Sequence, residues 1–297
     1  MVGLDKKALE ELVRAAVAET LQPRAPAGRG APVCDDEGDD VVCKPRVVPP
    51  ARVADRAALR RIAEATPARL VQGRVGTRYL TATYVGLRAE HAIALDAVHS
   101  AVPDDFAARL GCVPLHSRAV THEDFLLHPD LGRRLDDQSK EVLLREGTRG
   151  VDVQVIAADG LAAWAILDQG IVLVPALQEA LQAQGFSVGK PLFVKHARIG
   201  VQDEVGVLLG CKSTVILVGE RPGLGTGDSL SIYTAFRPRL GQDNAEKNCI
   251  SNIRPLGTPA KEAALECARL MRRTFDAGGG GVHLVRPLRD IQKRTSL

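Results

Sequence analysis

Aromatic residues are scarce in this sequence: there are one Trp, three Tyr and six Phe among 297 residues. A hydrophobic core must therefore be built mainly from Ala, Val, Leu and Ile. No run approaches the ~20 apolar residues that a membrane-spanning helix needs, so we expect no membrane association. Lys and Arg (39) nearly balance Asp and Glu (36), which leaves a net charge of +3. That balance argues against a nucleic-acid binder held mainly by bulk charge.

The six cysteines show neither the CxxC pairing of a zinc site nor the density of a disulfide scaffold. The first residues also lack the pattern of a secretory signal. We therefore expect a soluble, intracellular, reduced protein. With 45% hydrophobic and 25% charged residues the composition is that of a globular protein, and the length allows two domains.

The N-terminal part of the chain divides into two contrasting segments. Residues 4–21 place apolar side chains at helical spacing, so the segment 1–21 is expected to form an amphipathic helix. Residues 22–52 are rich in Pro, Gly and Asp and can bury little apolar surface, which is typical of a flexible linker. A helix tethered in this way either docks onto a partner or folds back on its own domain, and the pattern leaves both open.

The rest of the chain predicts a mainly helical domain over residues 53–150 and an α/β domain over 151–285, followed by a basic tail at 286–297. Strands are expected at 151–158, 191–195, 214–219 and 230–236, and helices at 173–184, 201–209 and 259–275. Strands that alternate with helices favour a largely parallel, Rossmann-like sheet.

The densest loop, residues 219–228, follows directly on an apolar strand. Ligands of open α/β sheets bind at the carboxyl ends of strands. Gly223, Gly225 and Gly227 would let a ligand approach the backbone closely, while Glu220 and Asp228 could accept hydrogen bonds. The spacing matches the dinucleotide fingerprint GxGxxG only loosely. A ligand cradle and a purely structural turn both stay open.

Three other clusters carry weaker signals. Cys249 could be a reactive thiol, but nothing local activates it, so an inert packed cysteine is favoured. His122 and His128, with Glu123 and Asp124 between them, come nearest to a metal pattern, although a solvated segment is favoured. Residues 73–78 place two arginines beside a glycine turn and could either contact phosphate or join two helices.

Several motifs together resemble one family. They are residues 73–81 (GRVGTRYLT), 88–98 (RAEHAIALDAV), 129–135 (PDLGRRL), 152–161 (DVQVIAADGL), 203–206 (DEVG), 219–225 (GERPGLG), 228–231 (DSLS), 249–253 (CISNI) and 257–264 (GTPAKEAA). In order and spacing they look like the small (light) subunit of ethanolamine ammonia-lyase. The resemblance covers about residues 68–285, and the pair GERPGLG and CISNI is its most specific part.

The resemblance implies an enzyme complex that uses adenosylcobalamin to convert ethanolamine to acetaldehyde and ammonia by a radical mechanism. Such a cofactor carries the difficult chemistry, and the protein supplies binding, orientation and electrostatics. In this family the substrate and the catalytic residues belong to a separate large subunit. The small subunit covers the cobalamin at the interface between the two, so this chain is expected to bind cofactor and to hold no main catalytic residue.

Carried over residue by residue, the cobalamin contacts of the family fall on Ile199, Glu220 and Cys249. Glu220 would accept hydrogen bonds from an amide arm of the corrin, and the other two suit a close apolar or backbone approach. The chain lacks the DxHxxG signature through which some cobalamin proteins supply a histidine to cobalt. We therefore expect the benzimidazole base of the cofactor to remain on the metal.

The sequence departs from the family pattern at Arg254, where a His is expected, in the long acidic linker and in the extended tail. Ethanolamine breakdown is often enclosed in a bacterial microcompartment, so the helix within residues 4–21 is a candidate for contact with shell proteins. Two rival interpretations remain: a stand-alone Rossmann-type NAD(P) enzyme that uses residues 223–228, and a non-catalytic scaffold that recruits partners through the N-terminal helix.

Overall fold

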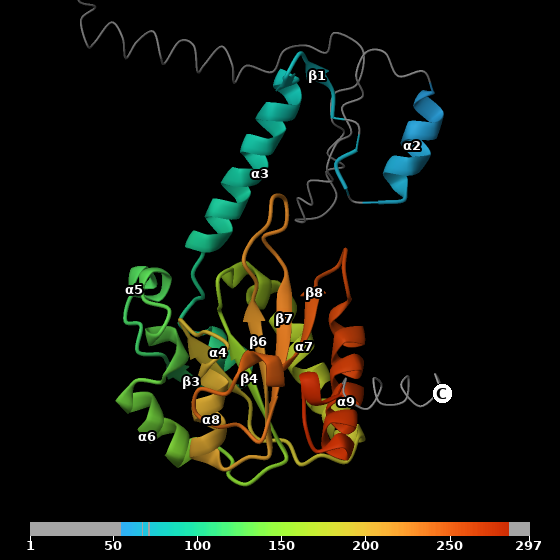
Figure 1. Cartoon of the computed structure of the whole chain (residues 1–297). Coiled ribbons are helices and arrows are strands. Elements are labelled where there is room, and N and C mark those ends of the chain that lie inside the picture. The colour runs from blue at the N-terminus through green and yellow to red at the C-terminus, as the bar shows by residue number, and fades with distance from the viewer. Residues whose placement is uncertain (1–54, 67, 71, 285–297) are drawn as a thin grey trace, which may run out of the picture. The chain divides into compact units, whose positions relative to one another are not determined.

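The computed structural model describes residues 55–284 except 67 and 71 (Figure 1). The predicted N-terminal helix, the linker 22–52 and the basic tail 286–297 lie outside the described residues. The segment from Lys44 to Leu297 forms one compact unit by its internal contacts.

A six-stranded sheet organises this unit, with the strand order β3-β5-β4-β6-β7-β8. The strands are β3 (Val113–His116), β4 (Val153–Ala158), β5 (Leu192–Lys195), β6 (Ser213–Gly219), β7 (Leu230–Phe236) and β8 (Asn248–Ile253). The first four in space are parallel, and β7 and β8 extend the sheet in antiparallel fashion. The prediction of a largely parallel α/β sheet is confirmed, and its four expected strands are β4 to β7.

Helices and one hairpin complete the described residues. The α-helices are α2 (Arg56–Glu64), α3 (Thr81–His99), α4 (Phe106–Arg109), α5 (His122–Leu127), α6 (Asp137–Glu146), α7 (Ala163–Ala183), α8 (Val201–Leu209) and α9 (Ala260–Ala277). Two 3₁₀ turns are η1 (Leu131–Arg133) and η2 (Asn244–Glu246), and β1 (Arg74–Val75) pairs with β2 (Arg78–Tyr79).

Residues 53–150 are less purely helical than predicted, because β3 lies in this segment and pairs with β5 of the main sheet. Its side chains alternate between buried and more exposed, but four residues are too few for the period-2 pattern to stand out. The expected boundary at residue 150 therefore does not separate the sheet from the helices before it. The strand order also differs from that of a Rossmann sheet, since the first strand lies at the edge and not in the centre.

Helix α7 begins ten residues before the predicted start at 173. Gly170 and Pro175 lie inside it, and both residue types normally disfavour helix interiors. Burial compensates for them, because one face of the helix, nine of its 21 residues, is buried and packs in the apolar layer on this side of the sheet. Helices α8 and α9 match the predicted stretches closely.

The two faces of the sheet are covered differently. Alternate residues of β4 point to opposite sides: Val153 and Val155 join the apolar cluster under α7 and α9, whereas Ile156 joins the cluster under α6 and α8. Side chains of β7 and β8 such as Ile232 and Ile250 extend the first cluster, whereas Tyr233 of β7 packs against the edge of the second. On the α8 side, none of the described helices packs closely on β7 and β8, and a cavity forms over this face.

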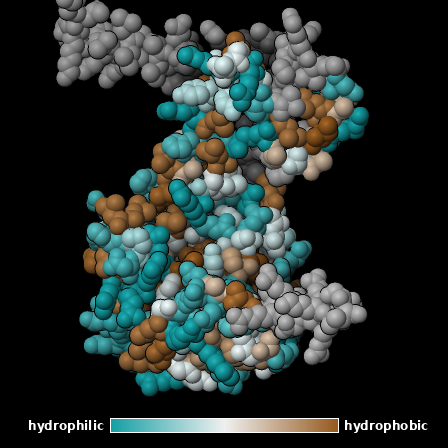
Figure 2. Space-filling view, viewed as in Figure 1, coloured by the Kyte–Doolittle hydropathy of each residue, from teal (hydrophilic) through white to brown (hydrophobic). Residues whose placement is uncertain are grey.

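Helix α3 is apolar but only slightly buried. Its large side chains Tyr84, Val85 and Leu95 are about half exposed, and Figure 2 shows brown hydrophobic residues along this helix among teal hydrophilic ones. None of the helices in the described part of the chain is long and apolar enough to cross a membrane.

Candidate functional site

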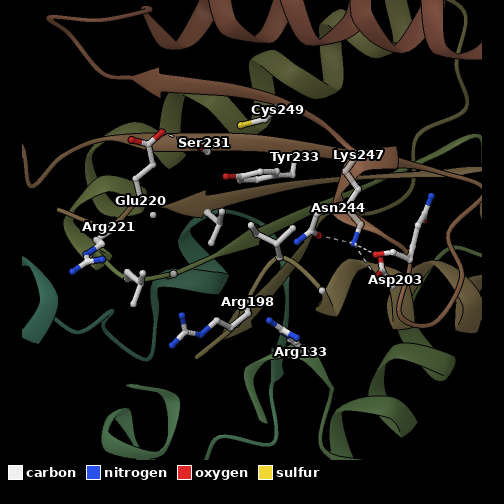
Figure 3. Close-up of a pocket in the computed structure, with 18 of the residues that line it drawn as sticks. Arg133, Arg198, Asp203, Glu220, Arg221, Ser231, Tyr233, Asn244, Lys247 and Cys249 are labelled. Atoms are coloured by element: carbon white, nitrogen blue, oxygen red, sulfur yellow. Dashed lines mark hydrogen bonds and ion pairs between the residues drawn. The ribbon is translucent and has the colours of Figure 1, made fainter. Parts of the chain in front are cut away.

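A cavity of about 1070 Å³ extends from the carboxyl ends of the parallel strands along one face of β7 and β8 (Figure 3). The loops after β4, β5 and β6 contribute Gly160, Ile199 and Glu220 to its lining. These three loops meet because the strands are parallel and neighbouring, so their carboxyl ends share one edge of the sheet. This is the edge at which open α/β sheets bind ligands.

The floor of the cavity is the uncovered face of β7 and β8. Ser231 and Tyr233 on β7, and Cys249 and Ser251 on β8, are spaced two residues apart and therefore point to the same side. Ile250, between the two β8 residues, is buried on the opposite face, whereas Cys249 and Ser251 are exposed. The antiparallel extension thus presents hydroxyl, phenol and thiol groups to the cavity.

All three residues that the family resemblance suggested line this one cavity. Ile199 precedes α8, Glu220 follows β6, and Cys249 lies on β8, so the fold brings together positions up to fifty residues apart. Ile199 is partly buried against the apolar cluster under α8. Only the tertiary structure brings these three residues together, because no local sequence pattern relates one to another.

Glu220 connects the three strands at this end of the sheet. Its Oε1 atom accepts a hydrogen bond from the Ser231 hydroxyl at 2.5 Å and another from the backbone N–H of Asn252 at 3.0 Å. Asn252 has a left-handed backbone with φ of +59°. Both contacts use Oε1, and within the described residues Oε2 has no hydrogen-bond partner. One oxygen therefore fixes the local structure while the other remains available to a ligand.

Tyr233 and Cys249 face each other across β7 and β8 as register partners. Burial, together with the hydrogen bond and charge of the Cys249 thiol, raises the pKa of the Tyr233 phenol to about 12. The phenol is therefore protonated at neutral pH and can donate a hydrogen bond. Cys112, Cys211 and Cys267 are buried, and burial raises the pKa of each of these thiols.

A buried ion pair forms one wall of the cavity. The ammonium of Lys247 lies 2.9 Å from Asp203, with side chains only 2% and 4% exposed. Lys247 also donates to the carbonyl of Gln242 and to Oδ1 of Asn244, as the dashed lines toward Asp203 and Asn244 in Figure 3 indicate. Burial raises the pKa of Asp203, and the neighbouring Lys247 opposes that shift.

The opposite wall carries arginines that sequence reasoning missed. Arg133 comes from η1 and Arg198 from the loop after β5, and both line the cavity. Arg133 lies within the family motif 129–135, but nothing local relates it to a residue sixty-five positions later. The backbone N–H of Arg198 donates to the carbonyl of Gly132 at 2.7 Å, which brings the two segments together.

The glycines at 223, 225 and 227 do not line the cavity. A Cβ on Gly227 would lie 3.0 Å from Ala97 and 3.1 Å from Trp164, so this glycine allows close packing against α3 and α7. Arg69 pairs with Glu90 of α3 and donates to the carbonyl of Leu224. The loop therefore packs on protein, which favours the structural turn over the dinucleotide cradle.

The remaining sequence candidates have structural roles. Thr121 and Asp124 form a capping box at the start of α5, and His122 packs against His196 at a ring distance of 6.0 Å. Within the described residues no group of three or more His, Cys, Asp or Glu side chains is arranged to hold a metal ion.

Two further positions lie outside the cavity lining. The arginines of residues 73–78 belong to the β1–β2 hairpin, where Arg74 stacks on Tyr79 at 4.8 Å. Arg254, the position at which a His was expected, donates to Oδ1 of Asn252 at 2.9 Å and lies 3.7 Å from Asp228. Its side chain therefore makes contacts beside the Glu220 cluster and is not part of the cavity wall.

Comparison with known proteins identifies the family. The family model for the ethanolamine ammonia-lyase light chain matches residues 56–285. The ethanolamine ammonia-lyase small subunit of Fusobacterium nucleatum is 42% identical over 219 residues, which is 74% of each chain. The small subunits of Clostridium perfringens and Listeria monocytogenes are 37% and 35% identical over 231 residues, 78% of this chain and 78% and 79% of theirs. The chain therefore belongs to the ethanolamine ammonia-lyase small-subunit family.

Proposed function

We propose that this chain is the cofactor-binding small subunit of an adenosylcobalamin-dependent ethanolamine ammonia-lyase. It would assemble with a large subunit that carries the substrate site, and together they would convert ethanolamine to acetaldehyde and ammonia. The observation that carries the proposal is the meeting of Ile199, Glu220 and Cys249 in one cavity. Each comes from a different part of the fold, and the family resemblance had named the three together as cobalamin contacts.

The chemistry of the cavity fits a corrinoid. Such a ligand has an apolar ring edge, several neutral carboxamide arms and one phosphodiester. Ile199 and Tyr233 offer apolar surface, while Oε2 of Glu220 and the Ser251 hydroxyl can accept hydrogen bonds from amide N–H groups. Buried polar atoms without a partner, Nε of Arg198 and Oε1 of Gln242, also belong to lining residues. A polar ligand would relieve their desolvation cost.

The role of this chain would be to bind and orient the cofactor and to exclude water from one side of it. When bound, the cofactor would supply the radical chemistry of the reaction. Because Cys249 and Ser251 are exposed on a sheet face without a covering helix, the cavity would be closed by the large subunit. This chain therefore supplies half of a cofactor site and no proposed catalytic residue.

We propose further that the benzimidazole base remains on cobalt. The described residues that line the cavity include no histidine, and the ring of His196, which directly follows β5, contacts the carbonyl of Ala119 through Nδ1. Electron paramagnetic resonance of the reduced cofactor in the complex tests this proposal. Labelling the histidines of the protein with ¹⁵N changes the observed nitrogen coupling only if a protein imidazole is bound to cobalt. Nitrogen coupling that follows ¹⁵N-histidine in the protein would contradict the proposal.

Reconstitution tests the main function. The purified chain, a matching large subunit and adenosylcobalamin are mixed, and acetaldehyde release from ethanolamine is measured. Activity that requires both chains and the cofactor supports the proposal. Binding of NAD(P) by this chain alone, with no corrinoid-dependent activity, would instead support the rival interpretation of a stand-alone Rossmann-type NAD(P) enzyme.

The amphipathic segment 1–21 is proposed to direct the complex to a bacterial microcompartment through contact with shell proteins. The sequence pattern supports this proposal, since apolar residues at helical spacing precede a segment rich in Pro and Gly. The segment lies outside the described residues, so the proposal rests on the sequence.

A further inference from the structure

Two arginines in the cavity wall are positioned by tight backbone packing. Gly132 has no room for a Cβ, which would lie 2.7 Å from Cγ of Arg198, and a Cβ on Gly200 would lie 3.2 Å from the side chain of Arg133. The two glycines let η1 and the loop after β5 interlock, with Arg133 and Arg198 side by side. Figure 3 shows both on the same side of the cavity, across from Tyr233.

The two guanidinium groups have like charges and no acidic partner. In the part of the chain that the structure describes, the cations of this cavity that pair with carboxylates are Arg134, 3.7 Å from Glu204, and Lys247, 2.9 Å from Asp203. Arg133 and Arg198 form no such pair, although Asp130, Asp243 and Glu220 line the same cavity. Burial, and then the charge of Arg133, lower the pKa of Arg198, but an arginine remains protonated in proteins.

Contacts with Phe125 fix the position of Arg198, but one of its hydrogen-bond donors has no partner. Its Nη2 donates to the carbonyl of Phe125 at 2.7 Å, and its guanidinium stacks on the Phe125 ring at 4.4 Å. Its Nε is buried and has no hydrogen-bond partner. Leaving a buried donor of a charged group unpaired costs free energy, and a bound anion would remove both this cost and the repulsion between the two arginines.

We infer that Arg133 and Arg198 form a subsite for a phosphodiester, the one anionic group of the cobalamin nucleotide loop. This inference rests on the proposed function. A pair of guanidinium groups matches the oxygens of a phosphodiester better than it matches the neutral carboxamides of the corrin. The hydrogen-bond acceptors around Glu220 would bind the carboxamides, and Arg133 and Arg198 would bind the phosphodiester. Together they would fix the orientation of the cofactor in the cavity.

The test compares two ligands that differ by this group. Adenosylcobinamide retains the corrin but lacks the phosphodiester and the base, so its binding reports the rest of the site. Dissociation constants for adenosylcobalamin and adenosylcobinamide are measured by equilibrium dialysis, in the dark, with the complete complex. The variants are Arg133→Gln and Arg198→Gln, with Arg269→Gln as the control. Arg269 is exposed on α9, on the other face of the sheet.

We expect each cavity variant to raise the dissociation constant for adenosylcobalamin about tenfold or more, as for one lost charge-assisted hydrogen bond. Binding of adenosylcobinamide should change little, and the control variant should match the wild type for both ligands. Equal losses for both ligands, or no loss for either, would overturn the inference. If the wild-type complex binds neither ligand, the proposed function itself fails.

Arg198 packs on Phe125, so its substitution could disturb the fold. Arg133 is exposed, and the Arg133→Gln variant therefore keeps the test decisive. Arg198→Lys gives a second check, because it retains the charge but loses the planar fork. We expect it to bind adenosylcobalamin with an affinity between those of the wild type and Arg198→Gln. Full recovery of wild-type affinity would show that charge alone suffices and would overturn the recognition by paired guanidinium groups.

Discussion

The carboxylate of Glu220 accepts the Ser231 hydroxyl at 2.5 Å through Oε1, the same oxygen that holds the backbone N–H of Asn252. One atom thus joins the end of β6 to β7 and β8. The second oxygen has no hydrogen-bond partner among the described residues, and Glu220 lines the cavity. This division lets the two roles of Glu220 be separated by mutation.

Glu220→Ala removes both oxygens and is expected to weaken cobalamin binding by about 1–3 kcal/mol, because the ligand amide that Glu220 would accept is then buried without a partner. Ser231→Ala is the matched control, since it removes the internal hydrogen bond and leaves Oε2 in place. The measurement is cobalamin affinity of the complex, alongside thermal unfolding. Unchanged affinity in Glu220→Ala would remove this residue from the site, and equal losses in both variants would assign it a structural role only.

Cys249 is exposed on the cavity floor, whereas Cys112, Cys211 and Cys267 are buried. N-ethylmaleimide should therefore modify Cys249 well before those three thiols in the native protein. Bound cobalamin should slow this modification in the complex, because the thiol would lie under the ligand. Peptide mass spectrometry after timed alkylation distinguishes each site. Modification of Cys249 at the same rate with saturating cofactor would place the ligand elsewhere.

The phenol of Tyr233 should lose its proton at a higher pH than an ordinary tyrosine does. Burial first, and then the neighbouring Cys249, raise its pKa from 10 to about 12. In this range the unfolded chain loses its phenolic proton before the folded chain does, so the contribution of Tyr233 to stability is full below pH 10 and falls as the pH rises toward 12.

The difference in phenolate absorbance between wild type and Tyr233→Phe isolates this titration from Tyr79 and Tyr84. Cys249→Ala should move the midpoint downward, because it removes one of the causes of the shift. A midpoint near 10 for the wild-type difference would show that the phenol is exposed to solvent.

Lys247→Met should destabilise the protein by about 3–5 kcal/mol, because it leaves the carboxylate of Asp203 buried without its partner. Replacing both partners, as in Asp203→Leu with Lys247→Met, should recover much of the loss. Denaturant midpoints of the full chain measure this. The matched control is Asp137→Asn, which breaks an exposed pair with Lys140 and should leave the midpoint unchanged. An equally small effect of Lys247→Met would contradict the burial of the pair.

Deletion of residues 1–21 should leave the lyase activity of the reconstituted complex intact and reduce its association with shell proteins. The reason is that the cavity residues lie far along the chain, from residue 125 onward. Co-purification with shells, with an N-terminally tagged full-length chain as the control, measures the effect. Equal encapsulation of the truncated and full-length chains would refute a targeting role.

Local sequence patterns were enough to predict much of the secondary structure of this protein and its family. Continuous apolar runs identified β4, β5, β6 and β7, and helical spacing identified α8 and α9, because these signals depend on neighbouring residues only. The motifs also identified the family, which the comparisons confirm. Through that resemblance the sequence named Ile199, Glu220 and Cys249 as candidate contacts.

Tertiary structure alone decided which residues share a site. It placed β3 at the sheet edge although its four residues carry little local signal, and it left one face of β7 and β8 uncovered, so that a cavity formed there. It also brought Arg133 beside Arg198, through packing at Gly132 that no nearby residue encodes. The scarcity of aromatics is met by an aliphatic core, and long-range strand order, which depends on contacts between distant residues, determined where the polar groups meet.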